Sequence, residues 1–214
     1  MADFDNVKEA GFFKALYLTW KKSLFSPEIF YEELNNTGGQ EEKSLSKHYF
    51  YALLFTYINL VFSFFWEVIF FKVGFYRNYA FLPKIPLFFE NRSFIDMYII
   101  LGVIFLLLIL GILYTVFLVI LTIVVHGFVM LMGGKQGIRN TFRIIGYASG
   151  VGVFSVFPIF GYNISAAWFA ALLIIGIKKT NGLSTSRSIM TLLLPFIFLS
   201  LILTVFLIKI LAAR

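Results

Sequence analysis

The chain has 214 residues, of which 60% are hydrophobic, 20% aromatic and only 14% charged, and its formal net charge is +7. A water-soluble domain of this size cannot bury so much apolar surface, so the composition excludes a soluble protein and indicates one embedded in a membrane. The absence of cysteine excludes disulfides, thiolate metal ligands and cysteine nucleophiles. In a membrane the positive charge is expected to face anionic lipid headgroups, and we predict no nucleic-acid partner.

Residues 1–48 are predicted to form a cytoplasmic segment with interfacial helices. A helix over residues 10–25 would carry aromatic side chains on one face and lysines on the other, which is typical of an amphipathic helix lying along the inner leaflet. Packing of this face on the protein's own membrane helices fits the pattern equally well. Ser26-Pro27 predicts the start of a second short helix, which Gly38-Gly39 would stop. The residues expected at the membrane interface are Phe13, Tyr17, Trp20, Lys14, Lys21 and Lys22.

Five apolar segments follow, so we predict an all-α integral membrane protein whose residues 49–214 form a five-span domain. A spanning helix needs about 20 apolar residues. Between Met97 and Lys135 lie 37 residues without Asp, Glu, Lys or Arg, the longest such stretch. It has no turn signal in its middle, so we expect one long helix that is tilted or protrudes from the bilayer. The predicted spans are residues 49–71, 97–132, 144–160, 164–177 and 188–208.

The third and fourth spans are expected to form a tight helical hairpin around a turn at residues 161–163. The fourth is short, so the pair is not expected to cross the hydrocarbon core fully. Small residues recur at spacings of four on both helices, which favours close helix association, within the chain or in a homo-oligomer. The residues expected to pack in this way are Gly146, Ala148, Gly150, Gly152, Ala166 and Ala170.

The distribution of Lys and Arg predicts a cytoplasmic N-terminus and an outer C-terminus. With five spans, the inner segments carry twelve of these residues and the outer segments six. Basic residues concentrate on the cytoplasmic side of membrane proteins. The outer loop at residues 74–96 is rich in aromatic side chains and is expected to lie in the interface.

No nucleophile has a nearby base, so we predict no catalytic residue, cofactor or metal site. Glu67 and His126 are the ionisable candidates within the spans, because a charge in lipid is costly. They should lie near opposite interfaces, so a proton relay between them is not expected. Glu67 is expected to reach the interface or pair with Lys72 or an outer-loop Arg, and His126 to form a helix–helix hydrogen bond, with a pH-sensing or gating role left open. A lipid phosphate could contact the basic loop residues Lys135, Arg139 and Arg143.

The segment from His126 to Ser188 resembles the Yip domain family, named for eukaryotic members that bind Ypt/Rab GTPases. The matching features are the His ending the long span, "GGK" before a basic loop, "GY" in the next span, "PIFG" at the hairpin and "GIKKTNGLS" before the last span. "SLFSPEIFYEEL" is similar to the lead-in of prokaryotic members. The resemblance implies five spans and a cytoplasmic N-terminus, in a prokaryotic plasma membrane. The short N-terminal segment lacks the family's "DLYGP" stretch, so a small GTPase partner is not expected.

The sequence therefore predicts a non-enzymatic membrane protein that organises or remodels the bilayer, or acts as a trafficking-type scaffold. Membrane lipids are its expected partners. The alternative is a lipid scramblase or a small-solute transporter or channel. For that alternative, Asn59, Tyr114 and Thr115 are the side chains that could line a polar groove.

Overall fold

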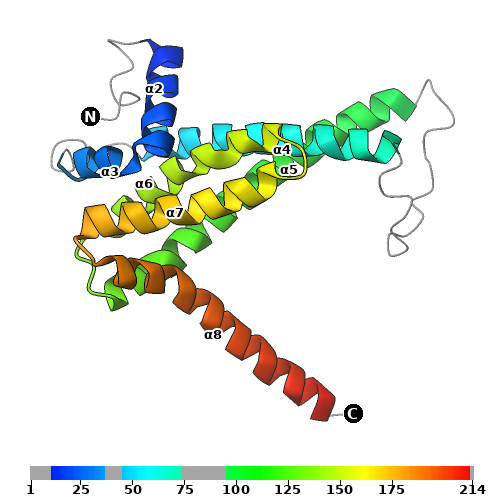
Figure 1. Ribbon diagram of the computed structural model, residues 1–214. Helices are drawn as coiled ribbons and strands as arrows, with labels where there is room; N and C mark the ends of the chain where they lie inside the picture. The colour runs from blue at the N-terminus through cyan, green and yellow to red at the C-terminus, as the bar shows by residue number, and fades with distance from the viewer. Residues whose placement is uncertain (1–10, 37–44, 74–94, 213–214) are drawn as a thin grey trace.

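The computed structural model describes residues 11–36, 45–73 and 95–212, and the regular structure in these ranges is entirely helical. Within these residues, four helices are long and apolar enough to cross a membrane, namely α4, α5, α7 and α8 (Figure 1). The elements are α2 (Phe12–Phe25), α3 (Pro27–Asn36), α4 (Ser46–Val73), α5 (Ile95–Leu131), α6 (Ile138–Ala148), the 3-10 helix η3 (Ser149–Val156), α7 (Gly161–Asn181) and α8 (Thr185–Ala212). The expected stop at Gly38-Gly39 and nearly all of the loop at residues 74–96 lie outside the described residues.

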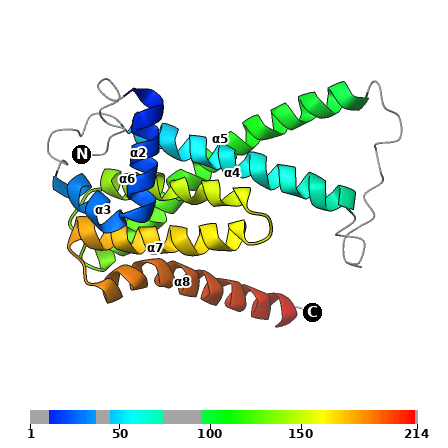
Figure 2. The same cartoon turned by 45° about the horizontal axis from the view of Figure 1, so that its top comes forward.

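The long uncharged run forms one helix, α5, as predicted. It has 37 residues, which corresponds to about 55 Å of helix. Figures 1 and 2 show α5 and the end of α4 extending well beyond α6, η3 and α7. After α5 the chain turns at Gly133, whose φ of 92° is readily adopted only by glycine.

The third predicted span, residues 144–160, differs from the structure in both its limits and its geometry. It begins earlier, at Ile138, and continues as 11 α-helical residues followed by eight 3-10 residues. Because a 3-10 helix rises about 2.0 Å per residue and an α-helix 1.5 Å, the two together extend about 32 Å. The chain then reverses before Gly161, with Ile159 at a φ of 66°. The turn is therefore at residues 157–160, not at 161–163.

The fourth predicted span, residues 164–177, was expected to be too short to cross a membrane, and this is wrong. Helix α7 has 21 residues and is among the four helices of spanning length. The polar residues that flank the predicted span are themselves helical and form the two ends of α7. Tyr162 and Asn163 are exposed in its first turn, and the helix continues through Lys178 to a left-handed Gly182 after its last residue.

Helix α4 runs beside α6 and η3 in the same direction, and their contacts extend from Gly146 to Val156, about 19 Å of α6 and η3. Gly146 lies against the backbone of His48 at one end. At the other end the Trp66 indole donates a hydrogen bond to the Val156 carbonyl at 3.1 Å. From residue 48 to residue 66 there are 18 positions along α4, or about 27 Å, against a hydrocarbon core of about 30 Å.

The two N-terminal helices pack at one end of this bundle. Helix α2 runs across the long helices instead of alongside them, in both views (Figures 1 and 2). Helix α3 buries Phe30, Tyr31 and Leu34, each at most 1% exposed. The Tyr31 hydroxyl donates to the Ile144 carbonyl at 3.3 Å, so α3 is part of the protein core.

Candidate functional site

The site is centred on η3, whose backbone is bonded by side chains from three other helices. Runs of 3-10 helix longer than three or four residues are uncommon, because their hydrogen-bond geometry is poorer. Within a membrane, irregular backbone needs partners from the protein. The donors from α2, α7 and α4 form the pairs Trp20 Nε1 to Gly150 O at 3.0 Å, Ser165 Oγ to Val151 O at 3.0 Å and Trp66 Nε1 to Val156 O at 3.1 Å. The 3-10 segment is thus one of the places where α2 joins the membrane helices.

Of the glycines predicted at the helix-packing positions, Gly146 and Gly152 lie against α4, and Gly150 lies against both α4 and α2. A Cβ at Gly152 would overlap the backbone carbonyl of Phe55. A Cβ at Gly150 would meet the side chains of Tyr51, Leu24 and Trp20. Ala148 is also buried, whereas Ala166 and Ala170 are exposed on α7.

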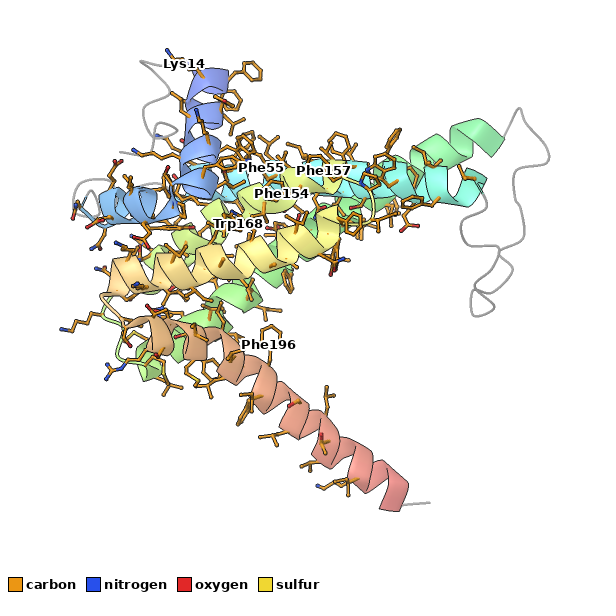
Figure 3. The ribbon with its side chains drawn as sticks, viewed as in Figure 1. Lys14, Phe55, Phe154, Phe157, Trp168 and Phe196 are labelled. Carbon is orange, nitrogen blue, oxygen red and sulfur yellow. The ribbon has the colours of Figure 1, made fainter. Side chains whose placement is uncertain are left out.

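The C-terminal half of α2 is fixed to the bundle. Leu24 is fully buried, and its carbonyl accepts a hydrogen bond from the Trp168 indole at 3.2 Å. The Ser23 hydroxyl lies 3.4 Å from the Tyr51 hydroxyl of α4. Figure 3 shows Trp168 near the base of α2 and Lys14 towards the end that projects from the bundle. Helix α2 therefore has an anchored half and a projecting half.

The predicted aromatic face of α2 is partly packed on the protein and partly exposed. Phe13 and Tyr17 are 82% and 55% exposed, whereas Trp20 packs against the core. Lys14 and Lys21 are exposed, and Lys14 shares the projecting half with the exposed aromatic rings. Lys22 instead pairs with a carboxylate of α3. The fully buried side of α2 includes the small residues Ala15, Thr19 and Ser23, which hydrophobicity alone does not identify.

Ion pairs hold α3 to its two neighbours. Lys22 Nζ lies 2.6 Å from Glu33, and Lys179 of α7 lies 3.3 Å from Glu28. The hydrogen bond from Lys22 holds the pKa of the Glu33 carboxyl below its ordinary value of 4.5. Because the folded-state pKa is lowered, this pair stabilises the fold above pH 4.5, and the contribution is lost as the pH falls through the folded-state pKa.

Glu33→Gln should therefore lower the melting temperature slightly at pH 7, and the difference from the native chain should shrink as the pH falls below the folded-state pKa of Glu33. The Glu33 side chain is 35% exposed, so solvent screening limits the loss to under about 1 kcal/mol. Thermal unfolding at several pH values measures this difference. A difference that grows on acidification would contradict the assignment.

The two histidines connect membrane helices near the end occupied by α2 and α3. His126 Nδ1 lies 3.0 Å from Thr141 Oγ1 and joins α5 to α6. Arg143 Nε donates to His48 Nε2 at 3.3 Å, so Arg143 is directed at a buried histidine. His48 precedes the first predicted span and is not among the predicted site residues. It lies at helical spacing with Tyr51 and Phe55, and this face could have identified it.

The remaining candidates are separated from this centre. Glu67 is exposed on α4 beside Trp66, at the opposite end from His126. Lys135 is exposed in the loop before α6, and Arg139 is exposed in its first turn. The polar side chains considered for a transport groove form hydrogen bonds between or within helices. Tyr114 is bonded to Ser149 at 3.0 Å, Thr115 to Tyr49 at 2.7 Å and Asn59 to Ser63 at 3.3 Å.

These helices and contacts define an integral membrane protein built from apolar helices. The protein-family model of the Yip1 domain matches residues 21–207, which is most of the chain. The chain therefore belongs to the Yip1 domain family, a membrane trafficking-related family not known as enzymes, which suggests a membrane-associated, non-enzymatic role. No curated protein matches the chain, and no solved structure matches it.

Proposed function

We propose that this protein organises or remodels the bilayer through α2. The observation that supports the proposal is that α2 runs across the spanning helices, with one half anchored and Phe13 and Tyr17 exposed on the other. A helix perpendicular to spanning helices lies in the membrane plane. There its aromatic rings enter the boundary between headgroups and acyl chains, while Lys14 and Lys21 contact anionic headgroups. The added volume expands one leaflet relative to the other, and membrane lipids are the partners.

We further propose five membrane passes, with α6 and η3 as the third. This assignment is supported by the contacts that follow α4 over about 27 Å and by the alternating directions of successive elements. The charge distribution favours a cytoplasmic N-terminus and an outer C-terminus, and the prokaryotic-type sequence favours a plasma membrane. The anchored end of α2 would then lie at the cytoplasmic leaflet.

The five-pass topology predicts opposite accessibility of two single cysteines in this cysteine-free chain. In intact cells, an impermeant maleimide should label Arg214→Cys but not Asn36→Cys. Both should react after the membrane is permeabilised, which controls for buried thiols. Equal labelling of the two variants in intact cells would require an even number of passes.

Reconstitution of the purified protein into liposomes tests the function itself. One preparation should be scored for vesicle deformation, lipid flip and ion leak. We expect deformation that increases with the protein-to-lipid ratio, without flip or leak above that of empty vesicles. Flip or leak without deformation would instead support the scramblase or channel alternative.

A further inference from the structure

Helix α4 carries a row of polar side chains in the middle of its membrane-crossing part. Thr56, Asn59 and Ser63 recur at spacings of three and four residues, so they share one face of the helix. Ser63 is exposed, and Thr56 and Asn59 are partly exposed. This polar face of α4 is therefore not fully covered by the rest of the chain.

Asn59 lies at the depth of the lipid tails. It is 11 residues, or about 16 Å of helix, from His48 at one end of the contacts between α4 and its neighbours. It is seven residues, or about 10 Å, from Trp66 at the other end. Helix α4 ends at Val73, about 21 Å of helix beyond Asn59. Because the hydrocarbon core is about 30 Å thick, the Asn59 amide is separated from both headgroup layers.

The Asn59 amide uses only half of its hydrogen-bonding capacity. The Ser63 hydroxyl donates to Asn59 Oδ1 at 3.3 Å. Among the residues that the structure describes, none accepts a hydrogen bond from Asn59 Nδ2. If the amide is turned over, its oxygen becomes the atom without a partner. Lipid tails neither donate nor accept hydrogen bonds, so a partner from outside the chain would stabilise this group.

A second copy of this chain fits the polar face of α4. Copies inserted in the same direction carry Asn59 at the same depth, and a two-fold axis along the membrane normal brings identical faces together. An amide is complementary to itself, because it has both donors and an acceptor. Asn side chains bond across helices in lipid, and a small residue such as Ser63 permits close approach. We propose that the protein forms a homodimer through α4, in which the two Asn59 amides bond each other.

Disulfide cross-linking in liposomes tests this contact, because the chain contains no cysteine. Ser63→Cys is oxidised at a low protein-to-lipid ratio, and the cross-linked fraction is measured on a non-reducing gel. The matched control is Ser200→Cys, because Ser200 is also an exposed serine within a spanning helix. It lies on α8, which α7 separates from α4 in both views (Figures 1 and 2). We expect a cross-linked dimer from Ser63→Cys and only random collisions from Ser200→Cys.

Adding Asn59→Leu to the Ser63→Cys chain tests the role of the amide. Leucine is similar in size but forms no hydrogen bond, so the same cross-linked fraction should require about a tenfold higher protein-to-lipid ratio. Val61→Leu, at an exposed position on another face of α4, should cross-link like the parent Ser63→Cys chain. If Asn59→Leu does not fold, the comparison of Ser63→Cys with Ser200→Cys decides the proposal.

Three results would overturn the homodimer. They are equal cross-linking of Ser63→Cys and Ser200→Cys, unchanged cross-linking after Asn59→Leu, and an effect of Asn59→Leu on lipid flip or ion leak alone. The last result would assign the polar face to a transport groove. The contact does not involve α2, and a monomer could still deform vesicles, so this proposal and the proposed function fail separately.

Discussion

Gly152→Leu is expected to lower the melting temperature of the detergent-solubilised protein on the order of 10 °C, whereas Gly127→Leu should have little effect. A side chain at Gly152 meets the backbone carbonyl of Phe55, which cannot rotate away as a side chain can. Helices α4 and η3 would have to separate. At Gly127 a new Cβ meets no atom within 4 Å, so the larger side chain enters open space on α5.

The melting temperature of Gly150→Leu should lie between those of the other two variants, because the neighbours of Gly150 are the movable side chains of Tyr51, Leu24 and Trp20. Thermal unfolding followed by size-exclusion chromatography ranks the three variants. Similar melting temperatures for Gly152→Leu and Gly127→Leu would show that the α4–η3 contact does not hold the fold together.

Changing Phe13 and Tyr17 together to Ser should abolish vesicle deformation while leaving expression, topology and melting temperature unchanged. Both side chains are mostly exposed, so the fold does not depend on them. Each aromatic side chain contributes about 2 kcal/mol when fully buried and less at an interface, so membrane contact of the projecting half is strongly weakened. Trp20 is left intact, because it bonds the Gly150 carbonyl and its loss would also disturb η3.

The matched control changes Phe160 and Tyr162 to Ser. These two aromatic side chains are 68% and 76% exposed at the turn between η3 and α7, at the other end of the hairpin. This control should still deform vesicles. If both double variants deform vesicles like the native protein, α2 has no special role.

The sequence predicts the membrane class and the long helix well, because both depend on a simple requirement. Uncharged apolar runs of sufficient length are stable in lipid, and residues 98–134 contain no competing charge or turn. The 3-10 geometry of residues 149–156 could not be predicted in this way. It depends on Trp20, Trp66 and Ser165, which come from distant parts of the chain and meet only in the folded protein.

The residues of α2 illustrate a second limit of prediction from the sequence. Lipid tails and protein cores are similarly apolar, so a hydrophobic face does not reveal which of the two it contacts. Tyr17 and Trp20 were expected on one face, yet Tyr17 is exposed and Trp20 is directed at η3. Arg143 was expected at headgroups, and its pairing with His48 depends on the packing of α4 on α6, which the sequence pattern does not show.

The proposed function depends most on the position of α2 in the bilayer interface, and spin labelling in liposomes measures this position directly. Labels are attached to Phe13→Cys and Lys14→Cys, and their collisions with oxygen and with a water-soluble nickel chelate are compared. We expect the label at residue 13 to collide mainly with oxygen, which concentrates in lipid, and the label at residue 14 mainly with the nickel chelate. Equal and high nickel accessibility at both positions would place α2 in water and contradict the proposed function.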